Sequence, residues 1–85
     1  MRHNLRYSAK IRWFDAMTGE GIVRINKTRE SMKVHFTAFY KPDDNNYNYP
    51  SGHMQERLKE LLPKGQNLMV EIDESFGIIG AEVVI

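Results

Sequence analysis

The sequence contains no cysteine, few prolines and no long apolar segment. Without cysteine, the chain forms neither a disulfide framework nor a thiolate metal site, and it offers no cysteine nucleophile. A transmembrane helix needs about 18 or more consecutive apolar residues, and no run approaches that length. The N-terminal residues also lack the apolar region of a secretory signal. We therefore expect a soluble, cytoplasmic protein with no membrane partner.

The length and composition are typical of one small domain. The chain has 85 residues, of which 41% are hydrophobic and 27% are charged. These fractions are ordinary for a globular protein and too apolar for a disordered one. We expect residues 1–85 to form a single domain.

The net charge of +1 conceals an uneven distribution along the chain. Residues 1–41 contain nine lysines and arginines and three acidic residues, whereas residues 42–85 contain three basic and eight acidic residues. A small protein with this division can present one positive and one negative face to its partners. The alternative is that both halves are ordinary solvated surface in mutual contact.

Alternating apolar and polar residues predict five short strands separated by turns. The strands are expected over residues 7–14, 21–25, 32–37, 67–73 and 78–85. In the third strand, Met32, Val34 and Phe36 fall on one face and Lys33, His35 and Thr37 on the other.

A helix is predicted over residues 53–62, with Ser51 as its N-cap and Pro63 after its end. Four apolar residues recur at helical spacing along one side: Met54, Leu58, Leu61 and Leu62. We interpret this stripe as core packing rather than as a surface for a partner. Five strands with a helix between the third and the fourth is the element order of an OB-type Greek-key barrel. The predicted fold class is therefore all-β, a five-stranded antiparallel OB-type barrel with one short inserted helix.

Candidates for catalysis are weak. The three histidines, His3, His35 and His53, are far apart and lack the short spacing of a zinc site. Neither a phosphate-binding glycine loop nor a nucleophile motif occurs, and the paired carboxylates lie in predicted turns. We expect no catalytic residue, no metal, no cofactor and no enzymatic activity.

Basic and aromatic side chains are interleaved on the first three predicted strands. They are Lys10, Arg12, Trp13, Phe14, Arg24, Lys33, His35 and Phe36. Single-stranded nucleic acid is bound by this combination, because bases stack on flat rings and cations contact the phosphates. The alternative is that Trp13 and Phe36 are core residues, since strand alternation places Trp13 beside the apolar Ile11.

Four segments carry recognisable motifs in order along the chain: residues 10–23, 32–39, 62–72 and 80–83. They resemble the K-W-F strand with its K-G-F-G-F-I motif, the V-F-V-H-F-S-A-I motif, the L-x-x-G-Q-x-V-x-F-x-V segment and the A-x-N-V ending of the cold-shock domain family. The resemblance implies an OB fold that binds single-stranded RNA or DNA by base stacking, as an RNA chaperone or a regulator of transcription or translation.

The base-stacking positions of that family are only partly kept. Trp13, His35 and Phe36 match the family, and Phe14 keeps an aromatic ring. Glu20, Ile22 and Lys33 stand where the family has phenylalanines. A carboxylate at position 20 supplies no ring and repels phosphate, whereas Lys33 exchanges a ring for a phosphate contact.

Residues 40–62 form an insertion where the family usually has a short loop. Tyr47 and Tyr49 within it are candidates to fold over the binding face, and the alternative is that the tyrosines pack the helix onto the barrel. The insertion also suggests a protein partner. Two hypotheses therefore stand: a binder of single-stranded RNA or DNA, and an OB-fold protein-interaction module with weakened nucleic-acid binding.

Overall fold

The computed structural model describes residues 5–40 and 50–85. The elements in chain order are β1 (Leu5–Asp15), β2 (Glu20–Ile25), β3 (Ser31–His35), the 3₁₀ turn η1 (Phe36–Ala38), α1 (Gly52–Leu61), β4 (Asn67–Asp73) and β5 (Gly77–Val83). The helix lies between β3 and β4, as predicted. Tyr47 and Tyr49 fall outside the described residues.

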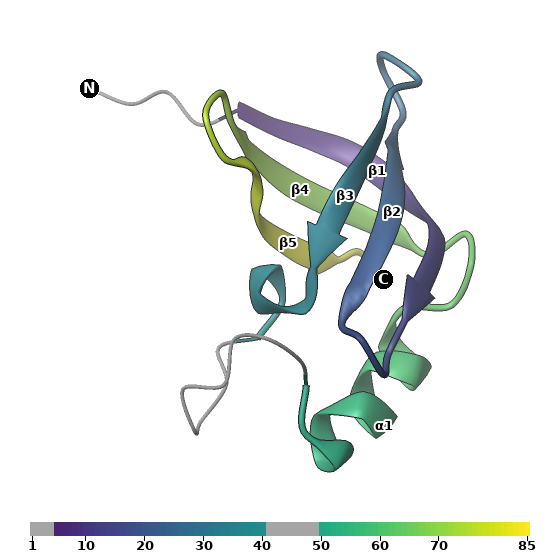
Figure 1. The fold of residues 1–85 in the computed structure, drawn as a ribbon. Coiled ribbons are helices and arrows are strands. Elements are labelled where there is room, and N and C mark those ends of the chain that lie inside the picture. The colour runs from purple at the N-terminus through teal and green to yellow at the C-terminus, as the bar shows by residue number, and fades with distance from the viewer. Residues whose placement is uncertain (1–4, 41–49) are drawn as a thin grey trace.

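The strands form one antiparallel sheet in the order β3-β2-β1-β4-β5. The sheet curls strongly, so that the edge strands β3 and β5 come into contact although no backbone ladder joins them in the described part of the chain (Figure 1). Curling of this kind follows from the right-handed twist of each strand and from bulges. The predicted all-β, OB-type architecture is confirmed.

Strand β1 is central because its first half pairs with β4 and its second half pairs with β2. The pairing with β2 shifts by one residue between Ile11, opposite Val23, and Trp13, opposite Ile22. Arg12 is therefore the extra residue of a β-bulge. Because side chains alternate along a strand, one extra residue moves those beyond it to the other face. The bulge thus keeps Ile11 in the core and brings Trp13 out of it.

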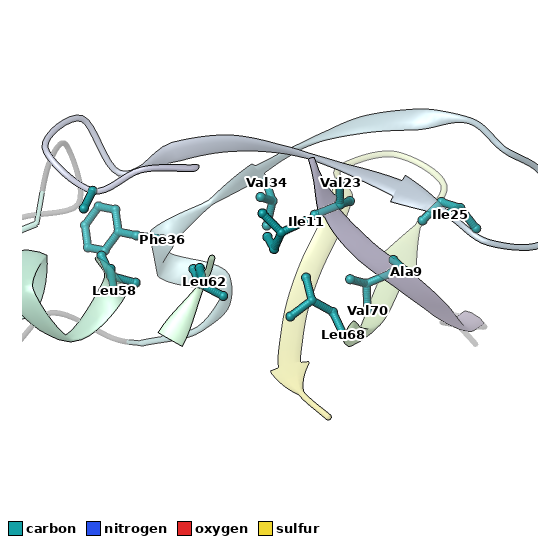
Figure 2. Packing of buried hydrophobic residues seen from close by; sticks show 11 residues of the cluster. Ala9, Ile11, Val23, Ile25, Val34, Phe36, Leu58, Leu62, Leu68 and Val70 are labelled. Carbon is teal, nitrogen blue, oxygen red and sulfur yellow. The ribbon is translucent and has the colours of Figure 1, made fainter. Parts of the chain in front are cut away.

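The core is an apolar cluster inside the curled sheet, closed at one end by the helix (Figure 2). Strands β1, β2, β3 and β4 contribute to it, together with η1 and the residues around α1. Its buried members are Ala9, Ile11, Ala16, Val23, Ile25, Val34, Phe36, Leu58, Leu62, Leu68 and Val70. Within it the side chains of Phe36 and Leu58 face each other (Figure 2).

Helix α1 begins where its cap predicts. The Ser51 hydroxyl accepts a hydrogen bond from the Met54 N–H at 3.3 Å, which satisfies one of the free amides of the first turn. Leu58 and Leu62 are buried, and Met54 and Leu61 pack against the core cluster. The interpretation of the apolar stripe as core packing is confirmed.

The third strand ends earlier than predicted. It stops at His35, and the chain turns through η1 because the Phe36 N–H donates to the Gly19 carbonyl oxygen at 2.7 Å. The turn directs the Phe36 ring into the core, against the β1–β2 turn. Gly19 has φ +78°, and a Cβ there would lie 2.4 Å from Phe36 Cδ1.

Replacing Gly19 with alanine is expected to lower the free energy of unfolding by about 2 kcal/mol or more, because backbone strain and overpacking add. Gly65 is the matched control: its φ is +87°, and among the described residues no atom beyond its chain neighbours lies within 4 Å of the place that a Cβ would take. Gly65→Ala is expected to lose only the backbone part, about 1 kcal/mol. Urea unfolding followed by circular dichroism measures both. Equal losses would show that the approach of Phe36 to Gly19 is not tight.

Candidate nucleic-acid interface

The outward face of β1, β2 and β3 gathers the exposed predicted residues into rows. Across the three strands, Lys10 pairs with Arg24, which pairs with Ser31. In the next row along, Trp13 pairs with Ile22, which pairs with Lys33. Paired residues on one face of an antiparallel sheet have Cβ atoms about 5 Å apart, so each row is one continuous strip of side chains.

A groove of about 490 Å³ lies on this face. It reaches from β1 across β2 and β3 to the β4–β5 turn and the start of β5. Its lining residues are Trp13, Glu20, Gly21, Ile22, Met32, Lys33, Val34, His35, Phe76, Gly77 and Ile78. The volume falls within the range of about 300–1,000 Å³ that is typical of small-molecule sites. The groove is therefore large enough for one flat organic ring and the groups attached to it.

Three rings from three separate elements border the groove. Trp13 is 53% exposed and Phe76 is 67% exposed, which is unusual for such large apolar side chains. His35 is half-buried. Its Nδ1 lies 2.8 Å from Thr37 Oγ1, and its ring packs against Phe36 with centroids 4.7 Å apart. These contacts hold the imidazole in one orientation at the groove wall.

Two of the predicted site residues are not brought to this face. Phe36 has 0% of its surface exposed, so the prediction that its ring contacts bases is wrong: the ring is enclosed by the core. Phe14 lies on the opposite side of β1 from Trp13. It packs edge-on against Phe39 at 6.2 Å and covers the backbone at Gly21. Both rings support the sheet instead of presenting a stacking surface.

Lys33 lines the groove, and three further basic residues, Lys10, Arg12 and Arg24, lie on β1 and β2. Lys10, Arg12 and Lys33 are exposed, and Arg12 is the bulge residue that precedes Trp13. Arg24 is half-buried, and its Nε has no hydrogen-bond partner within residues 5–40 and 50–85. Lys33 shares a row with Trp13, and Lys10 and Arg24 occupy a neighbouring row. Cations near exposed rings are the arrangement that can contact phosphates beside a stacked base.

Phe76 was not among the residues that the sequence predicted for the site. It sits in the β4–β5 turn, where Asp73 Oδ1 accepts hydrogen bonds from the Ser75 N–H at 2.8 Å and from the Phe76 N–H at 3.2 Å. Gly77, with φ +77°, completes the turn. The sequence signal for this residue was a single aromatic side chain in an otherwise polar turn. Phe76 reaches the groove only because the curl of the sheet brings the β4–β5 turn to the edge of β3.

The insertion is described only at its two ends. Tyr40 is half-buried, packs against the core cluster and lies under the Arg57 guanidinium, whose Cζ is 5.6 Å from the ring centroid. This tyrosine therefore packs the helix onto the barrel. The prediction that Tyr47 and Tyr49 cover the binding face concerns residues outside those that the structure describes.

No family model, no curated protein and no solved structure matches this chain when it is compared with known proteins. Within residues 5–40 and 50–85, none of the helical segments has the length and apolar character required to cross a membrane.

Proposed function

We propose that the protein binds single-stranded RNA or DNA across the outward face of β1, β2 and β3. The observation that carries the proposal is the placement of Trp13, His35, Phe76 and Lys33 around one groove. Lys10 and Arg24 lie in a neighbouring row of the same three strands. Only unpaired bases can enter such a groove, because the faces of bases in a duplex are already stacked on one another. The resemblance to cold-shock domains supports the same role.

In this mechanism, a base enters the groove and stacks on the exposed rings, each of which contributes about 1–3 kcal/mol. Lys33 and the cations of β1 contact the phosphates on either side. OB folds bind oligonucleotides on the face formed by the second and third strands, and the groove lies over the same two strands here. Binding of this kind suits a cytoplasmic RNA chaperone, or a regulator of transcription or translation that keeps strands open.

The proposal is tested by titrating a fluorescein-labelled oligo-dT or oligo-U with the protein and following anisotropy at several salt concentrations. Binding is expected to weaken as salt rises, because each phosphate contact releases counterions. Lys33→Gln is expected to weaken binding and to reduce the salt slope by about 0.7, the value of one contact on a single strand.

Lys59→Gln is the matched control for charge. Lys59 lies on α1, where it pairs with Glu56 at 3.8 Å, and it does not line the groove. This variant is expected to keep the affinity and the salt slope of the parent protein. Absence of binding at low salt by the folded parent protein would contradict the proposal. Equal effects of the two substitutions would contradict the placement of the interface.

A protein-interaction module is the second candidate, and the lining of the groove favours it in one respect. Ile22, Met32 and Ile78 make much of the lining apolar, and Glu20 adds a negative charge that repels phosphate. An apolar peptide segment with a basic residue would suit this lining. In that case Trp13 would be covered by a protein partner, and oligonucleotides would not bind at low salt.

A further inference from the structure

Glu20 is the one acidic side chain among the described residues that line the groove. It is exposed and stands opposite His35 on β3 and opposite Asp15 on β1. The Asp15 carboxylate accepts a hydrogen bond from the Met17 N–H at 2.9 Å and is thus engaged in its own turn. Glu20, by contrast, has no side-chain hydrogen bond or ion pair with any residue in the described ranges 5–40 and 50–85.

An ionised carboxylate can only accept hydrogen bonds. In a groove that holds a base between rings, it therefore selects for the base edge that offers the most donors. Guanine presents two donors side by side on its Watson–Crick edge, N1–H and N2–H₂. Uracil and thymine present one N–H between two carbonyl oxygens, which a carboxylate repels. Adenine and cytosine present one amino group beside a ring-nitrogen acceptor.

We propose that Glu20 makes the groove selective for guanine, by accepting hydrogen bonds from N1–H and N2–H₂ of a base that stacks against Trp13 and Phe76. The assignment rests on the proposed function and names its preferred ligand. It also gives Glu20 a role in specificity. Contacts to base edges distinguish one base from another, whereas repulsion of the phosphate backbone does not.

The two roles of Glu20 make different predictions for Glu20→Gln. If the carboxylate only repels phosphates, its neutralisation strengthens binding to every oligonucleotide by the same factor. If it recognises guanine, neutralisation removes one acceptor and places an amide donor against a guanine donor. The ratio of affinities for two oligonucleotides that differ in one base then changes. The ratio is therefore the diagnostic quantity, and the absolute affinity is not.

The experiment uses labelled oligo-dT strands of one length whose central nucleotide is dT, dG or deoxyinosine. Deoxyinosine keeps N1–H but lacks the N2 amino group. The parent protein is expected to bind the dG strand roughly 5- to 150-fold more tightly than the dT strand, the discrimination typical of a good bidentate pair. The deoxyinosine strand is expected to fall between them. This comparison needs no protein variant, so it does not depend on how a variant folds.

Glu20→Gln is expected to lose most of the preference for dG, while the matched control Glu60→Gln, exposed on helix α1, is expected to keep it. Equal binding of the dT, dG and deoxyinosine strands by the parent protein would overturn the guanine assignment and leave the proposed function standing. A preference for dG that survives in Glu20→Gln would also overturn it. If none of the strands binds, the proposed function fails, and the assignment fails with it.

Discussion

Replacing both Trp13 and Phe76 with alanine is expected to weaken oligonucleotide binding by about 2–6 kcal/mol, or roughly 30-fold and more. Each ring is largely exposed and borders the same groove, so the double variant removes the stacking surface without removing a core residue. Each single variant is expected to lose about 1–3 kcal/mol. Anisotropy titrations with labelled oligo-dT measure the three affinities.

Leu5→Ala and Met17→Ala provide matched controls for the loss of exposed apolar surface. Leu5 is 53% exposed on the same strand as Trp13, and Met17 is 65% exposed in a turn, as Phe76 is. Neither lines the groove. Both variants are expected to bind as the parent protein does. Losses in the controls as large as those at Trp13 and Phe76 would contradict the assignment of the groove.

Replacing Phe36 with alanine is expected to lower the free energy of unfolding by about 3–5 kcal/mol, the range for large-to-small changes at a fully buried phenylalanine. The ring has no exposed surface and lies between the β1–β2 turn and Leu58 (Figure 2). The total stability of small domains is typically only about 5–15 kcal/mol, so this variant is expected to be marginally folded. Urea unfolding followed by circular dichroism measures the loss.

Phe76→Ala is the matched control, because it removes the same ring from a position that is 67% exposed. Its free energy of unfolding is expected to change by about 0.5 kcal/mol or less. The two substitutions are therefore expected to lower different quantities: Phe36→Ala lowers the stability, and Phe76→Ala lowers the affinity for oligonucleotides. A Phe36→Ala protein as stable as the parent would contradict its place in the core.

The fold was predictable from the sequence because local patterns and tertiary packing agree. Residues that alternate in β3 and β4, such as Val34 and Val70, are buried as their period requires. The helix begins at the residue that the Ser51 cap indicates, and its apolar side packs on the core. Each of these signals depends only on residues near one another in the chain.

The site was harder to predict because the exposure of Trp13 depends on a single backbone irregularity. Strict alternation along β1 places Trp13 with Ile11 in the core, and only the bulge at Arg12 reverses that placement. Residue type favours Phe36 as a site residue, whereas alternation in β3 places it on the face of the buried Val34, and the structure follows the alternation. No periodic pattern in the sequence reveals the bulge at Arg12.

Phe76 could not be predicted as a site residue because its position at the groove depends on the long-range curl of the sheet. Phe76 belongs to the β4–β5 turn, far from β3 along the chain, yet it lines the same groove as His35. The curl of the sheet brings the two together. Glu20, Ile22 and Lys33 line that groove as well.

The central claim, that a base stacks on Trp13, is tested most directly by the fluorescence of Trp13 itself, the only tryptophan in the chain. Unlabelled oligo-dT, and the same strand with a central dG, are titrated into the folded protein at low and then at moderate salt. The account predicts saturable quenching that weakens as salt rises. Unchanged Trp13 fluorescence at low salt, with circular dichroism showing a folded protein, would contradict it.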